Sequence, residues 1–361
     1  PKSISAYNNG NILNGVSTLD LVLIQRHILG IQKIESPYKL LAADINNSRN
    51  VTASDLVNLR KLILGITLDF ENNTSWRFVP SEYTFQDAAF PFDFPSKINL
   101  DSIFEDKTNV NFTAVKVGDV NSSALANINS VPTERRSSSA LFTTELKSFE
   151  AGNTVRQEIK AGDIMEIMGA QFALTFDTDQ LAFSSIEGGK FDIKSHHINA
   201  LQAESGKIYF SFDMPKGINL KADDILFIIE YKSLSDGNTS FIKLDQSTLS
   251  AEVYEMDASV RPLHLQTRDR NAEGAQNILY QNEPNPFKDF TNISFELSKS
   301  SNVVIRVVDV TGKVVFSHKG QFGKGYNTIT VSNNQLANSG VYYYQIEAGE
   351  FSATKKMILI E

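Results

Sequence analysis

The stretch GAQFALTFDTDQLAFSSIEGG, residues 169–189, decides the fold class of the central part of this chain. Apolar side chains occupy every second position from Phe172 to Phe176, a turn signal follows at 177–179, and the alternation resumes at Leu181. Alternation with a period of two places one set of side chains on a single face of a strand. The pattern therefore predicts an antiparallel sandwich of two sheets with one buried face per strand.

Two further segments, KIYFSFD at 207–213 and DDILFIIEY at 223–231, extend the pattern of short apolar strands. The 169–189 stretch resembles the cohesin-type fold, in which a QF-x-L-x-[FY]-D-x-x-x-L sequence forms adjacent strands. This resemblance implies a cohesin-like β-sandwich over 140–265. It does not carry over the binding of a dockerin, because the residues that meet a dockerin are surface residues without a portable motif.

Composition excludes several classes of function. The chain has 361 residues, which suggests two or three domains, and a formal net charge of −8, which disfavours binding to nucleic acid or to an anionic membrane surface. It has no cysteine, so disulfides, thiolate metal sites and cysteine nucleophiles are absent. No apolar run approaches the roughly 18 to 20 residues needed to span a bilayer. Pro1 opens no leader, so we expect a mature chain or a fragment that begins downstream of its gene's start.

Breaks in composition and periodicity divide the chain into segments. We expect a helical module at 1–70 and an aromatic-rich annex at 71–120 that packs on it. A linker at 121–139 leads to a β-sandwich at 140–265, and a second linker at 266–277 leads to a terminal sandwich at 278–361. The expected fold class is therefore multidomain and mainly β, with one small α-helical part. The annex aromatics could also form a sugar-binding platform at Trp76, but packing on the small helical module is the favoured role.

The helical module contains an internal repeat. VSTLDLVLIQRHILGI, from Val16, and VTASDLVNLRKLILGI, from Val51, are identical at eight of sixteen positions. Each copy predicts one helix that ends at a glycine, Gly30 or Gly65, because glycine adopts the left-handed C′ conformation readily.

The segment before the second helix, DINNSRNVTASD, has the spacing of a calcium loop. Oxygen donors stand at positions 1, 3, 5, 7, 9 and 12 of the loop, the seventh through its backbone carbonyl: Asp44, Asn46, Ser48, Asn50, Thr52 and Asp55. A chain that wraps around a hard cation must present oxygens at alternate positions and a carboxylate at the end. The alternative is that these residues only cap turns before an amphipathic helix.

The segment before the first helix, NGNILNGVSTLD, has the same spacing but only one acid. We expect a degraded site that uses main-chain oxygens at two positions, with these ligands: Asn9, Asn11, Leu13, Gly15, Ser17 and Asp20.

Paired loops of this form, each followed by a helix such as LVLIQRHILG or LVNLRKLILG, resemble the dockerin domain over residues 8–68. The resemblance implies a calcium-folded module that binds a cohesin-like partner through one helix–loop copy. Arg49 stands where the family has glycine at position 6. Calcium is accordingly the one expected cofactor, in a structural role.

The C-terminal segment begins YQNEPNPF at 280–287 and ends KKMILI at 355–360, with TNISFEL, VVDVTGKVV, GYNTITV and SGVYYYQI between. About seven short strands predict a small Ig-like sandwich. The order of these motifs resembles the type A sorting domain of the type IX secretion system, found in exported proteins of the Bacteroidetes. The resemblance implies export through the outer membrane, to the surface or the medium, with the export machinery as partner. Candidate recognition residues are Gly312, Lys313, Gly340, Tyr342, Lys355 and Lys356.

The sequence contains no GxSxG, HExxH, Walker or dinucleotide motif, so we expect no enzyme. Three functions remain open at this point. In the first, the chain is the non-enzymatic C-terminal region of a larger surface protein of adhesin or assembly type. In the second, its dockerin-like and cohesin-like parts bind each other between molecules and build filaments. The third is an accessory region of a polysaccharide hydrolase encoded upstream.

Overall fold

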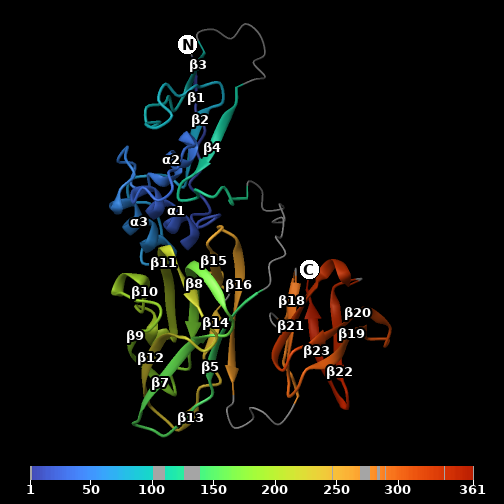
Figure 1. Cartoon of the computed structure of the whole chain (residues 1–361). Helices are drawn as coiled ribbons and strands as arrows, with labels where there is room; N and C mark the ends of the chain where they lie inside the picture. Colours follow the sequence, from blue (N-terminus) through green and yellow to red (C-terminus); the bar gives the residue numbers. More distant parts are fainter. Residues whose placement is uncertain are drawn as a thin grey trace. The chain divides into compact units, whose positions relative to one another are not determined.

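The computed structural model describes residues 2–100, 110–125, 139–245, 247–268, 277–282, 285–288, 290–336 and 338–360 (Figure 1). The chain divides into two compact units, Pro1–Arg268 and Asp269–Glu361. The first unit contains the helical module, the annex and the larger sandwich, and the second contains the smaller sandwich.

The helical module has three helices: α1 (Thr18–Ile28), α2 (Pro37–Ala43) and α3 (Ala53–Ile63). The two repeat helices, α1 and α3, begin in the same way, with capping boxes formed by Ser17 with Asp20 and by Thr52 with Asp55. Gly30 and Gly65 follow the two helices with φ of 69° and 65°, the left-handed conformation that ends a helix. The repeat therefore folds as two equivalent helices.

Two short two-stranded sheets accompany the helices. Strand β1 (Lys2–Ile4), at the start of the chain, pairs with β3 (Ile98–Leu100) of the annex, and β2 (Trp76–Pro80) pairs with β4 (Phe112–Lys116), both antiparallel. Val79 and Val115 of the annex, with the preceding Phe70, share one buried cluster with Leu21 and Leu59 of the helices. This shared core explains how a module with so few helical residues is stabilised.

The larger sandwich follows a hydrogen-bonded path β10-β11-β8-β15-β16-β5-β7-β12-β9, with β14 also paired to β8. Its longer strands are β5 (Ala140–Glu145), β7 (Thr154–Ala161), β8 (Met165–Thr175), β9 (Leu181–Gly188), β11 (Lys207–Leu220), β12 (Ile225–Ser233) and β16 (Val260–Arg268). The shorter ones are β6 (Ser148–Phe149), β10 (Ile198–Asn199), β13 (Gly237–Asn238), β14 (Lys243–Asp245) and β15 (Glu252–Glu255). Neighbours are antiparallel except β16 with β5.

Stacked aromatic rings fill the core of this sandwich. Phe172 of β8 and Phe210 of β11 pair across the sheet, with ring centroids 4.6 Å apart. Phe191 and Phe212 stack at 4.3 Å. The alternating residues of 169–189 point into this core, as the sequence pattern predicts.

The second unit is a sandwich of two antiparallel sheets, β17-β18-β21 and β20-β19-β22-β23. The strands are β17 (Ile278–Leu279), β18 (Phe290–Leu297), β19 (Ser301–Asp309), β20 (Val314–Phe322), β21 (Gly325–Ser332), β22 (Gly340–Ala348) and β23 (Phe351–Leu359). One apolar cluster, including Phe295, Ile305 and Tyr344, lies between the sheets.

The predicted fold class, mainly β with an α-helical module at the N-terminus, is confirmed. No helix in the described ranges has the length and apolar character needed to cross a membrane. The segment boundaries in the structure differ from the expected ones at two points. Residues 121–125 still contact the helical module and 266–268 belong to β16, while most of both expected linkers, 126–138 and 269–276, lies outside the described residues.

Candidate functional site

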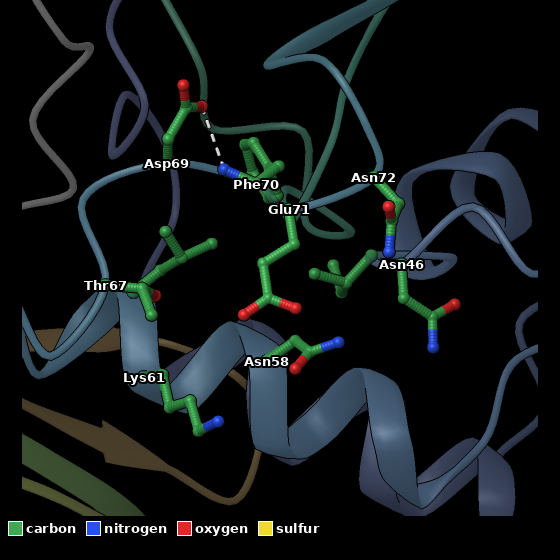
Figure 2. Close-up of a pocket in the computed structure, with 10 residues that line it drawn as sticks. Asn46, Asn58, Lys61, Thr67, Asp69, Phe70, Glu71 and Asn72 are labelled. Atoms are coloured by element: carbon green, nitrogen blue, oxygen red, sulfur yellow. Dashed lines mark hydrogen bonds between the residues drawn. The ribbon is translucent and has the colours of Figure 1, made fainter.

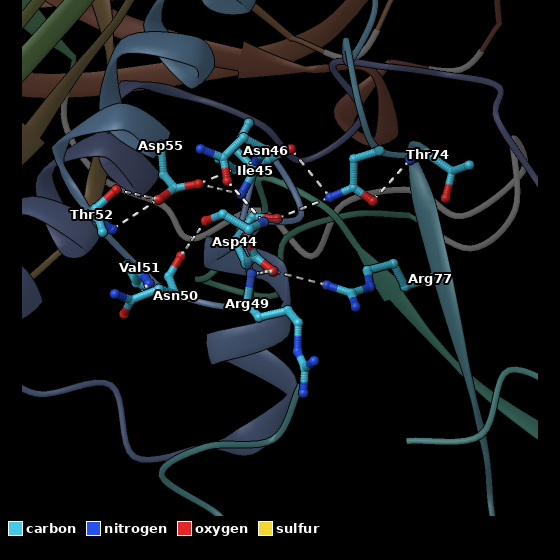
Figure 3. A network of polar contacts seen from close by, with 12 residues as sticks. Asp44, Ile45, Asn46, Arg49, Asn50, Val51, Thr52, Asp55, Thr74 and Arg77 are labelled. Carbon is cyan, nitrogen blue, oxygen red and sulfur yellow. Dashed lines mark hydrogen bonds and ion pairs between the residues drawn. The ribbon is translucent and has the colours of Figure 1, made fainter. Parts of the chain in front are cut away.

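The second loop wraps its oxygen atoms around the N-terminus of α3 (Figure 3). Asp44 accepts hydrogen bonds from the backbone N–H of Ser48 at 2.8 Å and of Arg49 at 3.2 Å. Asp55 closes the other end, because its Oδ1 accepts the N–H groups of Ile45 at 2.9 Å and Asn46 at 3.2 Å. The two ends of the loop are thereby held together.

The loop's remaining oxygens lie inside the same turn. Asn46 Oδ1 accepts from the Ser48 N–H at 3.0 Å, and the Ser48 hydroxyl lies 3.3 Å from the Asn50 carbonyl oxygen. Thr52 donates to Asp55 Oδ2 at 3.1 Å and is also the N-cap of α3. The structure therefore brings all six predicted second-loop residues to one place.

This donor set fits calcium. It consists of hard oxygen atoms, and both carboxylates, Asp44 and Asp55, are fully buried. Burial raises the pKa of Asp44, although Arg77, whose guanidinium lies 3.4 Å away, partly offsets the rise. Arg77 supplies one positive charge against two buried carboxylates, and a bound divalent cation would supply the remainder. Within the described residues, no group of three or more His, Cys, Asp or Glu side chains could hold a metal. A cation in the second loop would therefore also need the amide, hydroxyl and carbonyl oxygens of that loop.

The residues predicted for the first loop do not stay together. Gly15, Ser17 and Asp20 lie at the N-terminus of α1, where Ser17 donates to Asp20 Oδ2 at 3.1 Å. Asn9 instead accepts from the Ser75 N–H at 2.7 Å, and its amide faces Asp69. Asn11 is in the left-handed region with φ of 52°, and Leu13 is exposed.

The Asp20 carboxylate faces a different segment of the chain. Its Oδ1 accepts from the N–H groups of Val120 and Asn121, in the annex beyond β4. Burial, followed by the neighbouring Asp119 carboxylate, raises the pKa of Asp20 to about 7.

A shallow pocket opens beside α3 and holds about 290 Å³ of space that includes open solvent (Figure 2). Glu71 points its side chain towards the helix, near Asn58 and Lys61. The lining mixes polar and apolar residues: Ile45, Asn46, Asn58, Lys61, Leu62, Thr67, Asp69, Phe70, Glu71 and Asn72. We assign this pocket no function.

The outer face of β8 and β11 is covered by the helical module. Three cross-strand pairs alternate along these strands: Gln171 with Ser211, Phe172 with Phe210, and Ala173 with Tyr209. The Phe pair points into the sandwich core, and the flanking pairs point the other way. Those outward residues are nevertheless between 0 and 7 % exposed, and Ala173 and Tyr209 belong to the core cluster of the helical module.

Helix α1 makes the central contacts on this face. The Thr18 N–H donates to Gln171 Oε1 at 2.7 Å, and the Thr18 and Ser211 hydroxyls are 2.7 Å apart. Leu19 and Val22 of the same helix form a buried cluster with the sandwich residues Met168 and Tyr254. Polar bonds at one end of α1 and apolar packing along it thus fix the helix on the sheet.

Gly169 permits this close approach. A β-carbon at Gly169 would lie 2.9 Å from the Phe212 carbonyl oxygen and 3.3 Å from a methyl group of Val22. A larger residue would therefore force the helix and the sheet apart.

Helix α3 contacts the same face at its C-terminal end. Arg60 forms an ion pair with Asp213 of β11, and the two side chains are 11 % and 3 % exposed. Burial lowers the pKa of Arg60 and raises that of Asp213, and the attraction between them opposes both shifts. The amide of Asn199 donates to the Leu64 carbonyl at 2.8 Å, which satisfies one of the free carbonyls at the end of α3.

His197 lies beside this ion pair, with Nε2 3.7 Å from Asp213 Oδ1. Its Nδ1 accepts a hydrogen bond from the Lys194 N–H at 3.1 Å, which requires that nitrogen to be unprotonated. Burial, and then the charges of His196 and Arg60, lower the pKa of His197 to about 3.

In the second unit, the opening and closing motifs meet. The Phe287 N–H donates to the Ile358 carbonyl at 2.9 Å, and the Ile360 N–H donates to the Phe287 carbonyl at 2.8 Å. The buried Tyr344 hydroxyl of β22 holds the opening motif, because it accepts from the Asn282 N–H and donates to the Tyr280 carbonyl.

The candidate export residues occupy different parts of that unit. Gly312 and Lys313 lie in the turn from β19 to β20, whereas Gly340, Lys355 and Lys356 lie on the adjacent strands β22 and β23. Tyr342 is buried and donates to the Asn338 carbonyl, so its side chain is not at the surface. The neighbouring Tyr343 is 40 % exposed and pairs with Lys356 across the strands.

Three family models match separate parts of the chain. The Dockerin type I domain matches residues 13–64, the Cohesin domain matches 141–260, and the Secretion system C-terminal sorting domain matches 283–361. These matches confirm the three resemblances drawn from the sequence. The sorting-domain match indicates export by the type IX system to the cell surface or beyond. A comparison with curated proteins finds no match.

Similar solved structures include cohesins and cohesin–dockerin complexes. A type I cohesin–dockerin complex from Clostridium thermocellum is 11 % identical, with a TM-score of 0.29, and the match covers 36 % of this chain and 99 % of that one. The seventh ScaB type I cohesin from Pseudobacteroides cellulosolvens is 18 % identical, with a TM-score of 0.26, over 36 % of this chain and 88 % of that one.

Sequence reasoning missed the residues of the helix–sheet contact. Gln171, Ser211 and Asp213 stand at alternate positions expected to face water. The sequence carries only a weak sign that this face is buried. It has small or uncharged residues such as Ala173 and Gly169, where a face exposed to water would carry charged ones.

Proposed function

We propose that this chain is the non-enzymatic end of an exported surface protein, in which the dockerin-like module and the cohesin-like sandwich bind each other within one chain. The three matched domains are non-catalytic modules, and the sorting-domain match indicates export. The pair would form one rigid element that carries the rest of the protein outside the cell.

The observation that carries this proposal is the burial of the outward face of β8 and β11. Gln171 and Ser211 are 2 % and 0 % exposed, and both bond to Thr18 of α1. Buried polar groups that lack partners cost about 1–3 kcal/mol each, so a face that left these two groups without partners would be unfavourable. The contact therefore supports a specific pairing over incidental packing.

The repeat also supports the choice of α1 as the helix that binds. At the position equivalent to Thr18 the second copy has Ala53, and at the position equivalent to Val22 it has Val57, which is 52 % exposed. The second helix lacks the hydroxyl that bonds to Ser211. The two copies are therefore not interchangeable on this face.

Calcium has a structural role in this proposal. The second loop would hold the ion through Asp44, Asn46, Ser48, the Asn50 carbonyl and Asp55, and the bound charge would fix the start of α3 against α1. Arg60 and the Leu64 carbonyl at the other end of α3 would then be held in position to contact Asp213 and Asn199 of the sandwich.

Self-association of the full chain tests the proposal. Two versions of the chain with different affinity tags would be expressed together, and each would be captured in calcium over a wide range of concentration. Pairing within the chain predicts monomers by light scattering and no co-capture. Co-captured chains and a mass that grows with concentration would show that the domains pair between molecules and build open assemblies, which would contradict the proposal.

A further inference from the structure

Two buried carboxylates from distant parts of the chain face each other at the start of α1. Asp20 belongs to the first turn of that helix, and Asp119 follows strand β4 in the annex. They are 0 % and 7 % exposed. Their surroundings repeat, bond by bond, those of the second calcium loop.

The carboxylate at the end of each loop makes the same four bonds. Asp55 accepts from two successive N–H groups of 45–46 through Oδ1, and from the backbone and hydroxyl of Thr52 through Oδ2. Asp20 accepts from two successive N–H groups of 120–121 through Oδ1, and from the backbone and hydroxyl of Ser17 through Oδ2.

The carboxylate at the start of each loop is also equivalent. Asp119 accepts from the Ser123 N–H at 3.0 Å and the Ala124 N–H at 2.8 Å, as Asp44 does from the fourth and fifth residues after it. Asn121 Oδ1 accepts from the Ser123 N–H at 2.9 Å, the counterpart of the bond that the Ser48 N–H donates to Asn46 Oδ1. The fourth residue of each loop, Ser122 or Asn47, has positive φ, 64° and 55°.

The two halves of the first loop are joined in space, although they are not joined in sequence. The Ser123 hydroxyl donates to the Gly15 carbonyl at 3.0 Å, where the second loop has Ser48 and the Asn50 carbonyl. Asn14 and Leu125 exchange two hydrogen bonds, of 2.8 and 3.0 Å. A β-carbon at Gly15 would lie 2.4 Å from the Ala124 nitrogen, so glycine is required for this approach.

We propose that Asp119, Asn121, Ser123, the Gly15 carbonyl and Asp20 form a second calcium site, assembled from two segments of the chain. Its oxygens are two carboxylates, one amide, one hydroxyl and one carbonyl, the same types as in the second loop. Residues 13–64, which match the dockerin model, contain only two of these five ligands, Gly15 and Asp20.

In the part of the chain that the structure describes, no lysine or arginine forms an ion pair with Asp20 or Asp119. Lys116 acts electrostatically on Asp20 and Asp119, but its Nζ donates to the Ile12 and Val117 carbonyls at 2.8 and 2.9 Å. The same donor types as in the second loop thus surround two buried carboxylates whose charge a bound divalent cation would balance.

The number of calcium ions bound by the full chain tests this proposal. Chain stripped with a chelator would be dialysed against calcium well above the dissociation constant expected for extracellular modules, of order 10⁻⁴ to 10⁻³ M. We expect two ions per wild-type chain and one for Asp119→Ala. Asn121→Ala removes one ligand and should weaken one of the two sites at least tenfold.

Asn9→Ala and Asn11→Ala are the matched controls, because a loop continuous in sequence would use those residues. Both controls should retain two ions, and Asp44→Ala should retain one, held by the split site. Circular dichroism reports whether each variant folds, and Ser123→Ala replaces Asp119→Ala if the latter unfolds. The proposal is overturned by one ion in the wild-type chain, by two undiminished sites in the Asp119 and Asn121 variants, or by loss of an ion in Asn9→Ala.

Discussion

The Thr18 hydroxyl of α1 lies 2.7 Å from the Ser211 hydroxyl of β11, and both side chains are fully buried. One residue belongs to the first helix of the internal repeat and the other to the outer face of a sandwich. Their contact is the centre of the pairing between the two domains.

Replacing Thr18 with Val keeps the shape of the side chain but leaves the Ser211 hydroxyl without its partner. The free energy of unfolding of the first unit should fall by about 1–3 kcal/mol, measured by denaturant titration. The control is Ala53→Val, the exposed equivalent position in the second copy, which should change stability by less than about 0.5 kcal/mol. Equal effects at the two positions would argue against a contact at Thr18.

Removing one partner of the Arg60–Asp213 pair should be more costly. Asp213→Asn leaves a buried guanidinium without a counter-charge, and we expect a loss of about 3–5 kcal/mol. Asp223→Asn is a suitable control, because that carboxylate pairs with Arg268 at the surface with 70 % of its side chain exposed, and such pairs contribute about 0–1 kcal/mol. A double variant, Arg60→Met with Asp213→Leu, should recover much of the loss, whereas no recovery would indicate another role for Asp213.

Acid should destabilise the pairing through His197. Its pKa is about 3 in the folded chain and near 6.5 when unfolded, so the unfolded chain binds more protons between those values. The stability that His197 contributes is complete above pH 6.5 and is lost as the pH falls towards 3. Asn at position 197 keeps an acceptor for the Lys194 N–H but does not titrate.

The measurement is the unfolding midpoint of wild type and His197→Asn across this range of pH. The wild type should lose stability more steeply than the variant between pH 6.5 and 4. Parallel curves would show that His197 does not titrate on unfolding.

Calcium removal should destabilise the helical module. At a calcium concentration 100 times the dissociation constant, each bound ion contributes about 2.7 kcal/mol to the folded state. Thermal scans with and without chelator should therefore show a calcium-dependent transition in the first unit, which Asp44→Ala with Asp55→Ala reduces. A scan that does not respond to chelation would contradict a structural role for calcium.

Export should depend on the second unit alone. Deleting 278–361 should trap the protein in the periplasm, because the sorting domain is lost. Asp44→Ala with Asp55→Ala should still be exported, as shown by fractionation and immunoblotting. Loss of export in the calcium-loop variant, with the second unit folded, would show that this division of roles is wrong.

Local patterns predicted the elements well. The alternation from Phe172 to Phe176 depends on one strand and its two faces, so it predicted the sandwich without knowledge of its neighbours. The helices and their ends followed from the repeat and from Gly30 and Gly65, for the same reason.

The pairing of domains could not be predicted from such patterns. Gln171 and Ser211 lie on the face that alternation assigns to solvent, and they are buried only because another domain covers them. When a distant segment buries a face, the local sequence of that face shows no additional hydrophobic periodicity.

The split loop was hidden for a different reason. Residues 119–123, DVNSS, repeat the Asp-x-Asn-x-Ser spacing of DINNS at 44–48, yet composition alone places them at the end of the annex and the start of a linker. A calcium loop that is continuous in sequence would take its six ligands from the segment before α1. Asn9 and Asn11 then stand at the positions that Asp119 and Asn121 fill in space. A comparison of every Asp-x-Asn-x-Ser segment in the chain would have revealed the match.

A disulfide between α1 and β11 tests the pairing within the chain most directly, since the chain has no cysteine of its own. Thr18→Cys combined with Ser211→Cys would be oxidised in calcium and run on a non-reducing gel, with Ala53→Cys combined with Ser211→Cys as control. Pairing within one chain predicts a cross-linked monomer that reduction reverses, and no cross-link in the control. Cross-linked dimers and higher ladders, or no cross-link at all, would contradict it.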